Sequence, residues 1–265
     1  AIDCFVVESV VTMVGHYIDS GVKDYSVEAA ISKVLASEAM WRTGNEALQI
    51  AGGNGFMKEY PYERIIRDSR INLIFEGTNE ILRLYIALSG MKDAGTYLKD
   101  VLRSAEGIFN DPIKGFGVLS GYATKRFSQL TSLGRDRIVT GVPSELRDEV
   151  RVFENYTLEL GGATDAVLRR HGEKIIGKQF AMKRLADVVI DLFAGFCVLS
   201  RVSSMLKEQS ADQCAQPLAI ARVFTQQAKR RMNQNLRRLV KNEDDDLKVL
   251  ASFVVSEGGY PWDVL

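Results

Sequence analysis

The sequence predicts an all-α protein with two groups of helices. Apolar residues recur at intervals of three and four over several long segments, the period of a helix with one buried face. Sustained two-residue alternation is absent from the 265 residues, as are hairpin dipeptides between apolar runs, so no β-sheet is expected. Scattered glycines between about residues 92 and 141 separate the two groups. Each group contains enough amphipathic helix to form an antiparallel bundle.

Two long helices open the first group. Residues 1–20 carry an apolar stripe at helical spacing, and this helix is expected to end near Gly21. The stripe consists of Phe5, Val6, Val10, Met13 and Val14. Ser26 is a suitable N-cap for the second helix, which is expected to continue to about Ile50. The glycines that follow either form an ordinary C-cap or let the backbone approach a ligand. They are Gly52, Gly53 and Gly55.

A tight bend precedes the last helix of the first group. A short helix is expected over residues 62–69, after Pro61, and the next helix starts at Thr78, a residue suited to the N-cap. The apolar stripe of that helix is formed by Ile81, Leu84, Tyr85 and Leu88. Glu76, followed at once by Gly77, therefore places a carboxylate on a bend at a helix entrance, where it can act as a general base. An ordinary helix cap without chemistry is the alternative that the local pattern leaves open.

The glycine-containing connector has one candidate helix. A short stretch within it can segregate apolar from basic side chains, as membrane-surface helices do. The residues concerned are Leu119, Tyr122, Lys125, Arg126, Phe127 and Leu130. A solvated loop with one docked helix is the alternative interpretation.

Three helices are expected in the second group. The first covers residues 143–170, with the 161–162 glycine pair as a candidate interruption. The clearest covers residues 178–206, and its apolar face is expected to be core. Pro217 opens the third, whose basic last turns precede the acidic run 243–246. The adjacent acids and the lack of interleaved aromatic residues indicate a solvated helix face rather than a nucleic-acid site.

Composition argues against several classes of protein. Lysine and arginine together number 34, as do aspartate and glutamate, so the net charge of zero favours neither nucleic acid nor an anionic surface. The three cysteines and two histidines lack metal-ligand spacing, and no metal site is expected. The same cysteines indicate a reducing compartment and buried or inert thiols. No apolar run reaches the ~18 residues that a membrane-spanning helix requires.

Three segments, in this order and spacing, resemble the C-terminal signature of the acyl-CoA dehydrogenases. They are residues 49–56 (QIAGGNGF), 59–68 (EYPYERIIRD) and 74–81 (IFEGTNEI). Residues beyond about 90 resemble the extra helical region of the very-long-chain type and of its mitochondrial relative, family member nine. The resemblance implies a four-helix-bundle-like dehydrogenase domain at 1–90, a connector at 91–144 and a second helical bundle, the extra C-terminal domain, at 145–265.

The resemblance also implies an FAD-dependent oxidoreductase of fatty acid β-oxidation. Its reaction converts a long-chain or very-long-chain fatty acyl-CoA to the trans-2-enoyl-CoA. Glu76 matches the base that removes the α-proton, and Phe75 and Gly77 match substrate contacts. The positions that match flavin contacts are Thr78, Asn79 and Glu80, with Gln49, Gly52 and Gly53 facing the flavin of the neighbouring subunit.

The same resemblance implies partners and a location. The partners are electron-transfer flavoprotein as electron acceptor, a second subunit in a homodimer, and a membrane surface at about residues 107–143. The location is intracellular: the mitochondrial matrix or inner-membrane surface in a eukaryote, the cytoplasm in a bacterium. Because the chain starts within a helix and without methionine, we expect a fragment that lacks the family's N-terminal domains and is inactive alone. The alternative function is a non-catalytic helical module for respiratory-complex assembly, which the similarity to family member nine permits.

Overall fold

The computed structural model describes residues 1–91 and 141–262, and all regular structure in these ranges is helical. The first range contains α1 (Ile2–Asp19), α2 (Ser26–Ala51), α3 (Gly53–Phe56), α4 (Tyr62–Arg70), a 3-10 turn (Ile71–Leu73) and a helix over residues 79–91. The second contains 3-10 turns at Ser144–Leu146 and Gly172–Gly177, with α7 (Arg147–His171), α8 (Gln179–Glu208), α9 (Ala215–Val240) and α10 (Asp244–Ser256). The all-α prediction is confirmed.

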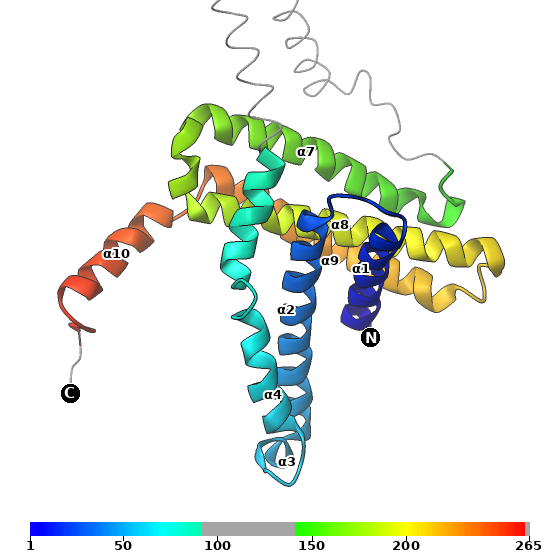
Figure 1. Ribbon diagram of the computed structural model, residues 1–265, viewed down its shortest axis with the longest axis horizontal. Coiled ribbons are helices and arrows are strands. Elements are labelled where there is room, and N and C mark those ends of the chain that lie inside the picture. The colour runs from blue at the N-terminus through cyan, green and yellow to red at the C-terminus, as the bar shows by residue number, and fades with distance from the viewer. Residues whose placement is uncertain (92–140, 263–265) are drawn as a thin grey trace, which may run out of the picture.

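Helix α8 lies at the centre of the fold and packs against α1, α7 and α9 (Figure 1). One buried cluster combines side chains from these four helices, among them Val6, Phe153, Val198 and Ala221. Another combines α2, the 79–91 helix, α7 and α8, among them Ile31, Ile86, Val167 and Met182. Both clusters cross from the first described range to the second, so the two groups of helices are packed together.

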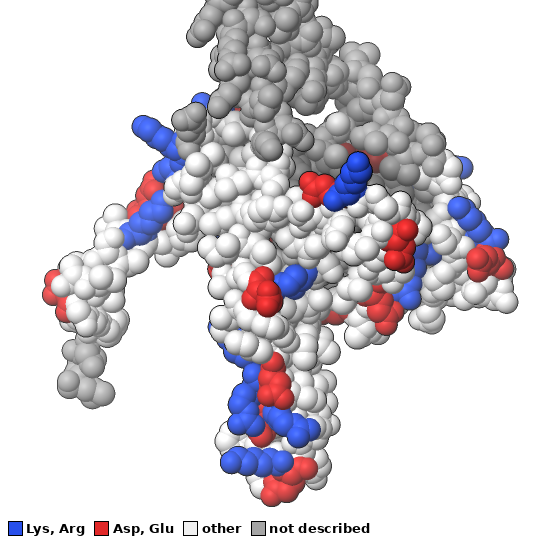
Figure 2. Space-filling view, viewed as in Figure 1, with Lys and Arg blue, Asp and Glu red and all other residues white. Residues whose placement is uncertain are grey.

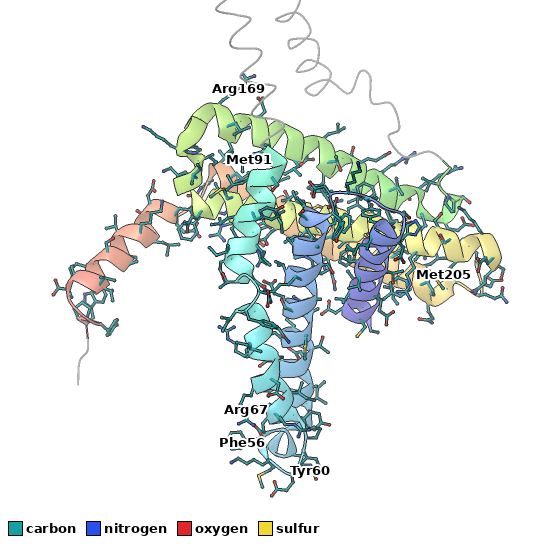
Figure 3. All side chains as sticks on the ribbon, in the orientation of Figure 1. Phe56, Tyr60, Arg67, Met91, Arg169 and Met205 are labelled. Carbon is teal, nitrogen blue, oxygen red and sulfur yellow. The ribbon has the colours of Figure 1, made fainter. Side chains whose placement is uncertain are left out.

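The distal part of α2, with α3 and α4, projects from this body as an arm, which comprises residues 41–70 (Figure 1). Acidic and basic side chains are interleaved on its visible face (Figure 2). Arg67 and Glu63, one helical turn apart on α4, form an ion pair in which the closest nitrogen and oxygen are 3.4 Å apart. Phe56 and Tyr60 lie exposed at the end of the arm (Figure 3). The arm therefore presents both apolar and charged groups for contact with another surface.

Most of the helix limits predicted from the sequence are confirmed, but the predicted N-cap of α2 and the candidate interruption of α7 are wrong. Ser26 is the first residue of α2 rather than its N-cap, and its N–H and hydroxyl donate to Asp24 Oδ1 at 3.1 and 2.7 Å. The 161–162 glycine pair does not interrupt α7. The helix is continuous through the pair, with buried contacts on both sides of it at Phe153 and Val167.

The predicted apolar stripe of the 79–91 helix is not the face that enters the core. Ile81, Tyr85 and Leu88 are exposed, and Leu84 packs only at the edge of the core. The opposite face is buried, and it includes Asn79, Arg83, Ile86, Ala87 and Met91. The reason is that the two polar side chains on that face have ion-pair and hydrogen-bond partners on α2 and α8, which makes their burial tolerable.

The acidic run after α9 begins a separate helix, which the sequence interpretation missed. Asp244, Asp245 and Asp246 form the first turn of α10, where negative charge is favoured by the helix dipole. The bidentate pair of Asp244 with Arg184 ties this turn to α8 at 2.7 and 2.5 Å. No residue of α10 is buried, and the helix extends away from the body (Figure 1).

Two of the three cysteines are buried. Cys4 is exposed on α1, because the buried face of that helix is formed by Val6 and Val10. Cys197 and Cys214 are buried, and burial raises the pKa of the Cys197 thiol to about 12.

The connector predictions fall outside the described residues. The candidate membrane-surface helix lies within residues 92–140, as does nearly all of the membrane contact predicted at about 107–143. In the two described ranges, no helix combines the length and apolar character needed to cross a bilayer.

Candidate functional site

The bend before the 79–91 helix has an unusual backbone. Glu76 has a φ of 54°, and it is the one non-glycine residue with positive φ in the described part of the chain. A side chain in this left-handed region costs roughly 1–2 kcal/mol, so the surrounding structure must hold it there. Gly77 follows with a φ of 90°, where the absence of a Cβ relieves the same strain. Strained backbone of this kind is frequent at functional sites.

Thr78 caps the helix that starts immediately after the bend. Its hydroxyl Oγ1 accepts the N–H of Ile81 at 3.3 Å, and its carbonyl accepts the N–H of Leu82 at 2.9 Å. The capping prediction is confirmed. The N-terminal partial charge of the helix is therefore directed toward the bend that carries Glu76.

Helix α2 ties down the other side of the bend. The Lys33 ammonium Nζ donates to the carbonyl of Gly77 at 2.8 Å and to Asn79 Oδ1 at 2.7 Å. Burial lowers the pKa of Lys33, against the opposing charges of Glu80 and Glu38. The amide nitrogen of Asn79 donates to Ser37 Oγ at 3.0 Å and to Glu38 Oε1 at 3.3 Å. Asn79 is 1% exposed, and its side-chain hydrogen bonds to α2 hold the bend in place.

Arg83 connects α2 to α8 just below the bend. Its Nη1 and Nη2 donate to the two carboxylate oxygens of Glu38 at 2.6 and 2.9 Å, and its Nε donates to Asp187 Oδ1 at 2.6 Å. Lys183 donates to the other oxygen of Asp187 at 3.1 Å. Burial alone would lower the pKa of Arg83, but the two carboxylates raise it above its ordinary value. Burial alone would raise the pKa of Glu38, but hydrogen bonds and charge from Arg83 hold it below its ordinary value.

The carboxylate of Glu76 is exposed and has apolar neighbours in the chain. Ile74 and Phe75 are each 47% exposed, and Glu80 is exposed in the first turn of the helix. A carboxylate beside exposed apolar side chains is a candidate general base for a partly apolar ligand.

The glycine turn lies far from the bend. It is at the end of the arm, between α2 and α3, and Gly52 has a φ of 57° that favours glycine. A Cβ at Gly52 or Gly53 would meet nothing within 4 Å, so the backbone there is open, and Gln49 is exposed beside it. Because α2 rises about 1.5 Å per residue, Gly52 lies on the order of 20 Å from Ser37, which contacts the bend.

The predicted site residues therefore lie in two separate places in the structure rather than in one. The bend brings together Phe75, Glu76, Gly77, Thr78, Asn79 and Glu80. The end of the arm holds Gln49, Gly52 and Gly53. Because the two places are on the order of 20 Å apart, a compact ligand bound at the bend of one chain does not reach the end of the arm of the same chain. The end of the arm can therefore contact a neighbouring molecule.

Sequence reasoning missed two residues that hold the bend, Lys33 and Arg83. Arg83 follows Asn79 at a spacing of four, so the two share one helix face, but a polar pair of this kind is usually solvated. Lys33 lies on the mixed face of α2, and its link to Gly77 spans 44 positions in the chain. Among the described residues no group of His, Cys, Asp and Glu could hold a metal ion.

A cleft of about 550 Å³ lies over the Arg83 network, between α1, α2, α8 and α9. Its charged side chains are largely paired with each other: Arg42 with Asp3 at 3.1 Å, and Arg231 with Asp191 at 2.6 Å. Because these charges neutralise each other, electrostatics do not favour an ionic ligand in the cleft.

Comparison with known proteins defines the class. A family model described as "Acyl-CoA dehydrogenase, C-terminal domain" matches residues 1–91, and one described as "ACAD9/ACADV, C-terminal domain" matches residues 144–260. The chain belongs to the acyl-CoA dehydrogenase family, within its C-terminal region.

The similar sequences include the very-long-chain type. The mitochondrial very long-chain specific acyl-CoA dehydrogenases of Rattus norvegicus and Homo sapiens are 40% and 42% identical over 205 residues, which is 77% of this chain. A probable acyl-CoA dehydrogenase of Bacillus subtilis is 28% identical over 240 residues, or 90% of the chain. The chain spans 31% of the length of the two mammalian relatives and 37% of the bacterial one.

A solved structure shares the fold. The crystal structure of acyl-CoA dehydrogenase complexed with FAD from Bacillus anthracis aligns with a TM-score of 0.72 at 22% identity. The alignment covers 99% of this chain and 45% of that one.

Proposed function

We propose that this chain supplies the catalytic base of an FAD-dependent acyl-CoA dehydrogenase of fatty acid β-oxidation, with Glu76 removing the α-proton of a long-chain or very-long-chain acyl-CoA. The backbone of Glu76 is the observation that carries this proposal. Glu76 has a strained left-handed backbone at the entrance of a capped helix, and this strain lowers the stability of the fold. Such strain is typical of residues whose position has a function. The product is the trans-2-enoyl-CoA.

The bend supplies more than the carboxylate. An α-proton is too weakly acidic for an unassisted glutamate, so the thioester oxygen needs preorganised donors. We propose that the backbone N–H of Glu76 is one of them. Gly77, which lacks a side chain, leaves space for the thioester, and the exposed ring of Phe75 contacts the acyl chain.

The residues at both places fit a flavin dinucleotide. The first turn of the 79–91 helix offers N–H groups that have no partner within the helix, and anions bind at such ends. We assign this end of the flavin site to Thr78, Asn79 and Glu80. Asn79 contributes its backbone, because its side chain is committed to α2. The open backbone at Gly52 and Gly53, with Gln49, suits the flavin of a neighbouring subunit. When bound, FAD accepts the β-hydrogen as hydride.

Further parts of the proposal concern partners and organisation. The chain acts within a homodimer, passes electrons to electron-transfer flavoprotein, and works in the mitochondrial matrix, at the inner-membrane surface, or in a bacterial cytoplasm. Its organisation is a dehydrogenase domain at 1–90, a connector at 91–144 and an extra helical domain at 145–265. The similarity to mitochondrial very long-chain specific enzymes supports the mitochondrial location.

The test is Glu76→Gln in the full-length protein, assayed by reduction of an artificial electron acceptor with a C16 acyl-CoA. The amide keeps the shape but cannot take the proton, so turnover should fall by about 10²–10⁴-fold with flavin content unchanged. Glu46→Gln, which neutralises an exposed carboxylate on α2, is the matched control and should keep full activity. Turnover of Glu76→Gln near the wild-type rate would remove Glu76 from this role.

A further inference from the structure

We propose that Asp187 and Arg83 are positioning residues, through which α8 holds the bend that carries Glu76. The inference rests on the proposed function for the role of Glu76, but the physical link between α8 and the bend can be tested without turnover. It gives the 144–260 region a part in the chemistry although the base lies about 110 positions earlier in the chain.

The link consists of short contacts between charged and polar groups. Asp187 Oδ1 accepts from Arg83 Nε at 2.6 Å, and the other end of the same guanidinium donates to both oxygens of Glu38. Glu38 Oε1 also accepts the amide of Asn79 at 3.3 Å. Asp187 therefore fixes the guanidinium, which in turn fixes the carboxylate that orients Asn79.

Asn79 transmits this order to the bend. Its Oδ1 accepts from Lys33, and the same ammonium donates to the carbonyl of Gly77, the residue next to Glu76. The left-handed backbone of Glu76 persists only while its surroundings determine it. Loosening of Glu38 and Asn79 frees Lys33 and the Gly77 carbonyl, which lets the Glu76 backbone relax.

Burial makes the link stiff. Arg83 is 8% exposed, and the Asp187 side chain is 18% exposed, so water competes weakly for these hydrogen bonds. Removal of the Asp187 charge leaves Glu38 as the remaining carboxylate partner of the guanidinium among the described residues, beside a longer contact of 3.5 Å to the Asn79 carbonyl. A buried guanidinium that loses one of its two ion-pair partners moves toward solvent or a new partner. The carboxylate and amide that it orients then move as well.

The experiment is amide hydrogen exchange in the full-length protein, comparing wild type with Asp187→Asn. The N–H groups of Ile81 and Leu82 report on the bend, because their acceptors are the Oγ1 and the carbonyl of Thr78. We expect their exchange to accelerate by about tenfold in Asp187→Asn. Asp187→Glu, which keeps the charge, should restore most of the protection.

The matched control is Asp191→Asn. Asp191 lies one turn further along α8 and is more buried, but its bidentate partner is Arg231 rather than Arg83. Asp191→Asn should leave Ile81 and Leu82 exchange unchanged. Unchanged exchange in Asp187→Asn would overturn the proposal, and so would equal acceleration in both variants, which would mean general destabilisation.

A kinetic readout separates this proposal from that for Glu76. If the link positions the base, Asp187→Asn lowers kcat by a factor of about ten with little change in KM. A failure of Glu76→Gln to lose activity would refute the base assignment but would leave the exchange result intact. Faster exchange without any loss of kcat would refute the positioning role alone.

Discussion

Replacement of Gly195 by alanine tests how closely α7 and α8 approach. A Cβ built at Gly195 would lie 2.3 Å from two ring carbons of Phe153, whereas ordinary contact begins at 3.4 Å. The ring must therefore move by about 1 Å. Phe153 is fully buried, and the centroid of its ring lies 5.8 Å from that of Phe196, so the close-packed interior resists this movement. Overpacking of this kind costs typically 1–3 kcal/mol, which outweighs the ~1 kcal/mol that alanine gains over glycine in a helix.

Gly161→Ala is the matched control. Gly161 lies inside α7, and its Cβ would meet nothing within 4 Å, so only the helix preference of alanine applies. We expect Gly195→Ala to lower the free energy of unfolding by up to about 2 kcal/mol, and Gly161→Ala to raise it by about 0.5–1 kcal/mol. Denaturant unfolding followed by far-ultraviolet circular dichroism measures both. A Gly195→Ala protein as stable as the Gly161→Ala protein would refute the packing argument.

Two further predictions concern titration and thiol chemistry. The depressed pKa of Glu38 gives stability that is present above its ordinary value of 4.5 and is lost as pH falls through the folded-state pKa. The free energy of unfolding should therefore fall more steeply below pH 4.5 in wild type than in Glu38→Gln, and equal slopes would contradict the Arg83 pairing. Of the three cysteines, Cys4 alone is exposed, so a thiol reagent such as 5,5′-dithiobis(2-nitrobenzoic acid) should react rapidly with one thiol in the native chain and with three after denaturation. Rapid native reaction of Cys197 would contradict its buried, high-pKa environment.

The helices and the bend could be predicted from the sequence because their signals are local. The stripe of Val6, Val10 and Val14 predicts the buried face of α1, and Thr78 predicts the cap, since both depend on neighbours within one or two turns. The motif segments identified the family for the same reason. α10 was missed because its acidic first turn has the composition of a solvated loop.

The tertiary partners of polar residues could not be predicted in this way. The apolar stripe at Ile81, Tyr85 and Leu88 has a stronger hydrophobic signal than the face with Asn79 and Arg83, yet the latter is buried. Its burial depends on carboxylates of α2 and α8 that are 45 and 104 positions away in the chain. Periodicity identifies that a helix has two faces, whereas partners distant in the chain decide which one is inside.

Removal of the α-proton by Glu76 can be measured directly, as exchange of that proton with solvent at the α-carbon. Full-length protein loaded with FAD is incubated with a C16 acyl-CoA in D₂O without an electron acceptor, and deuterium at the α-carbon is followed by mass spectrometry. Wild type should incorporate deuterium much faster than the free thioester, whereas Glu76→Gln should bind the acyl-CoA and show only the uncatalysed rate. Wild-type rates of deuterium incorporation in Glu76→Gln would contradict the assignment of Glu76 as the base.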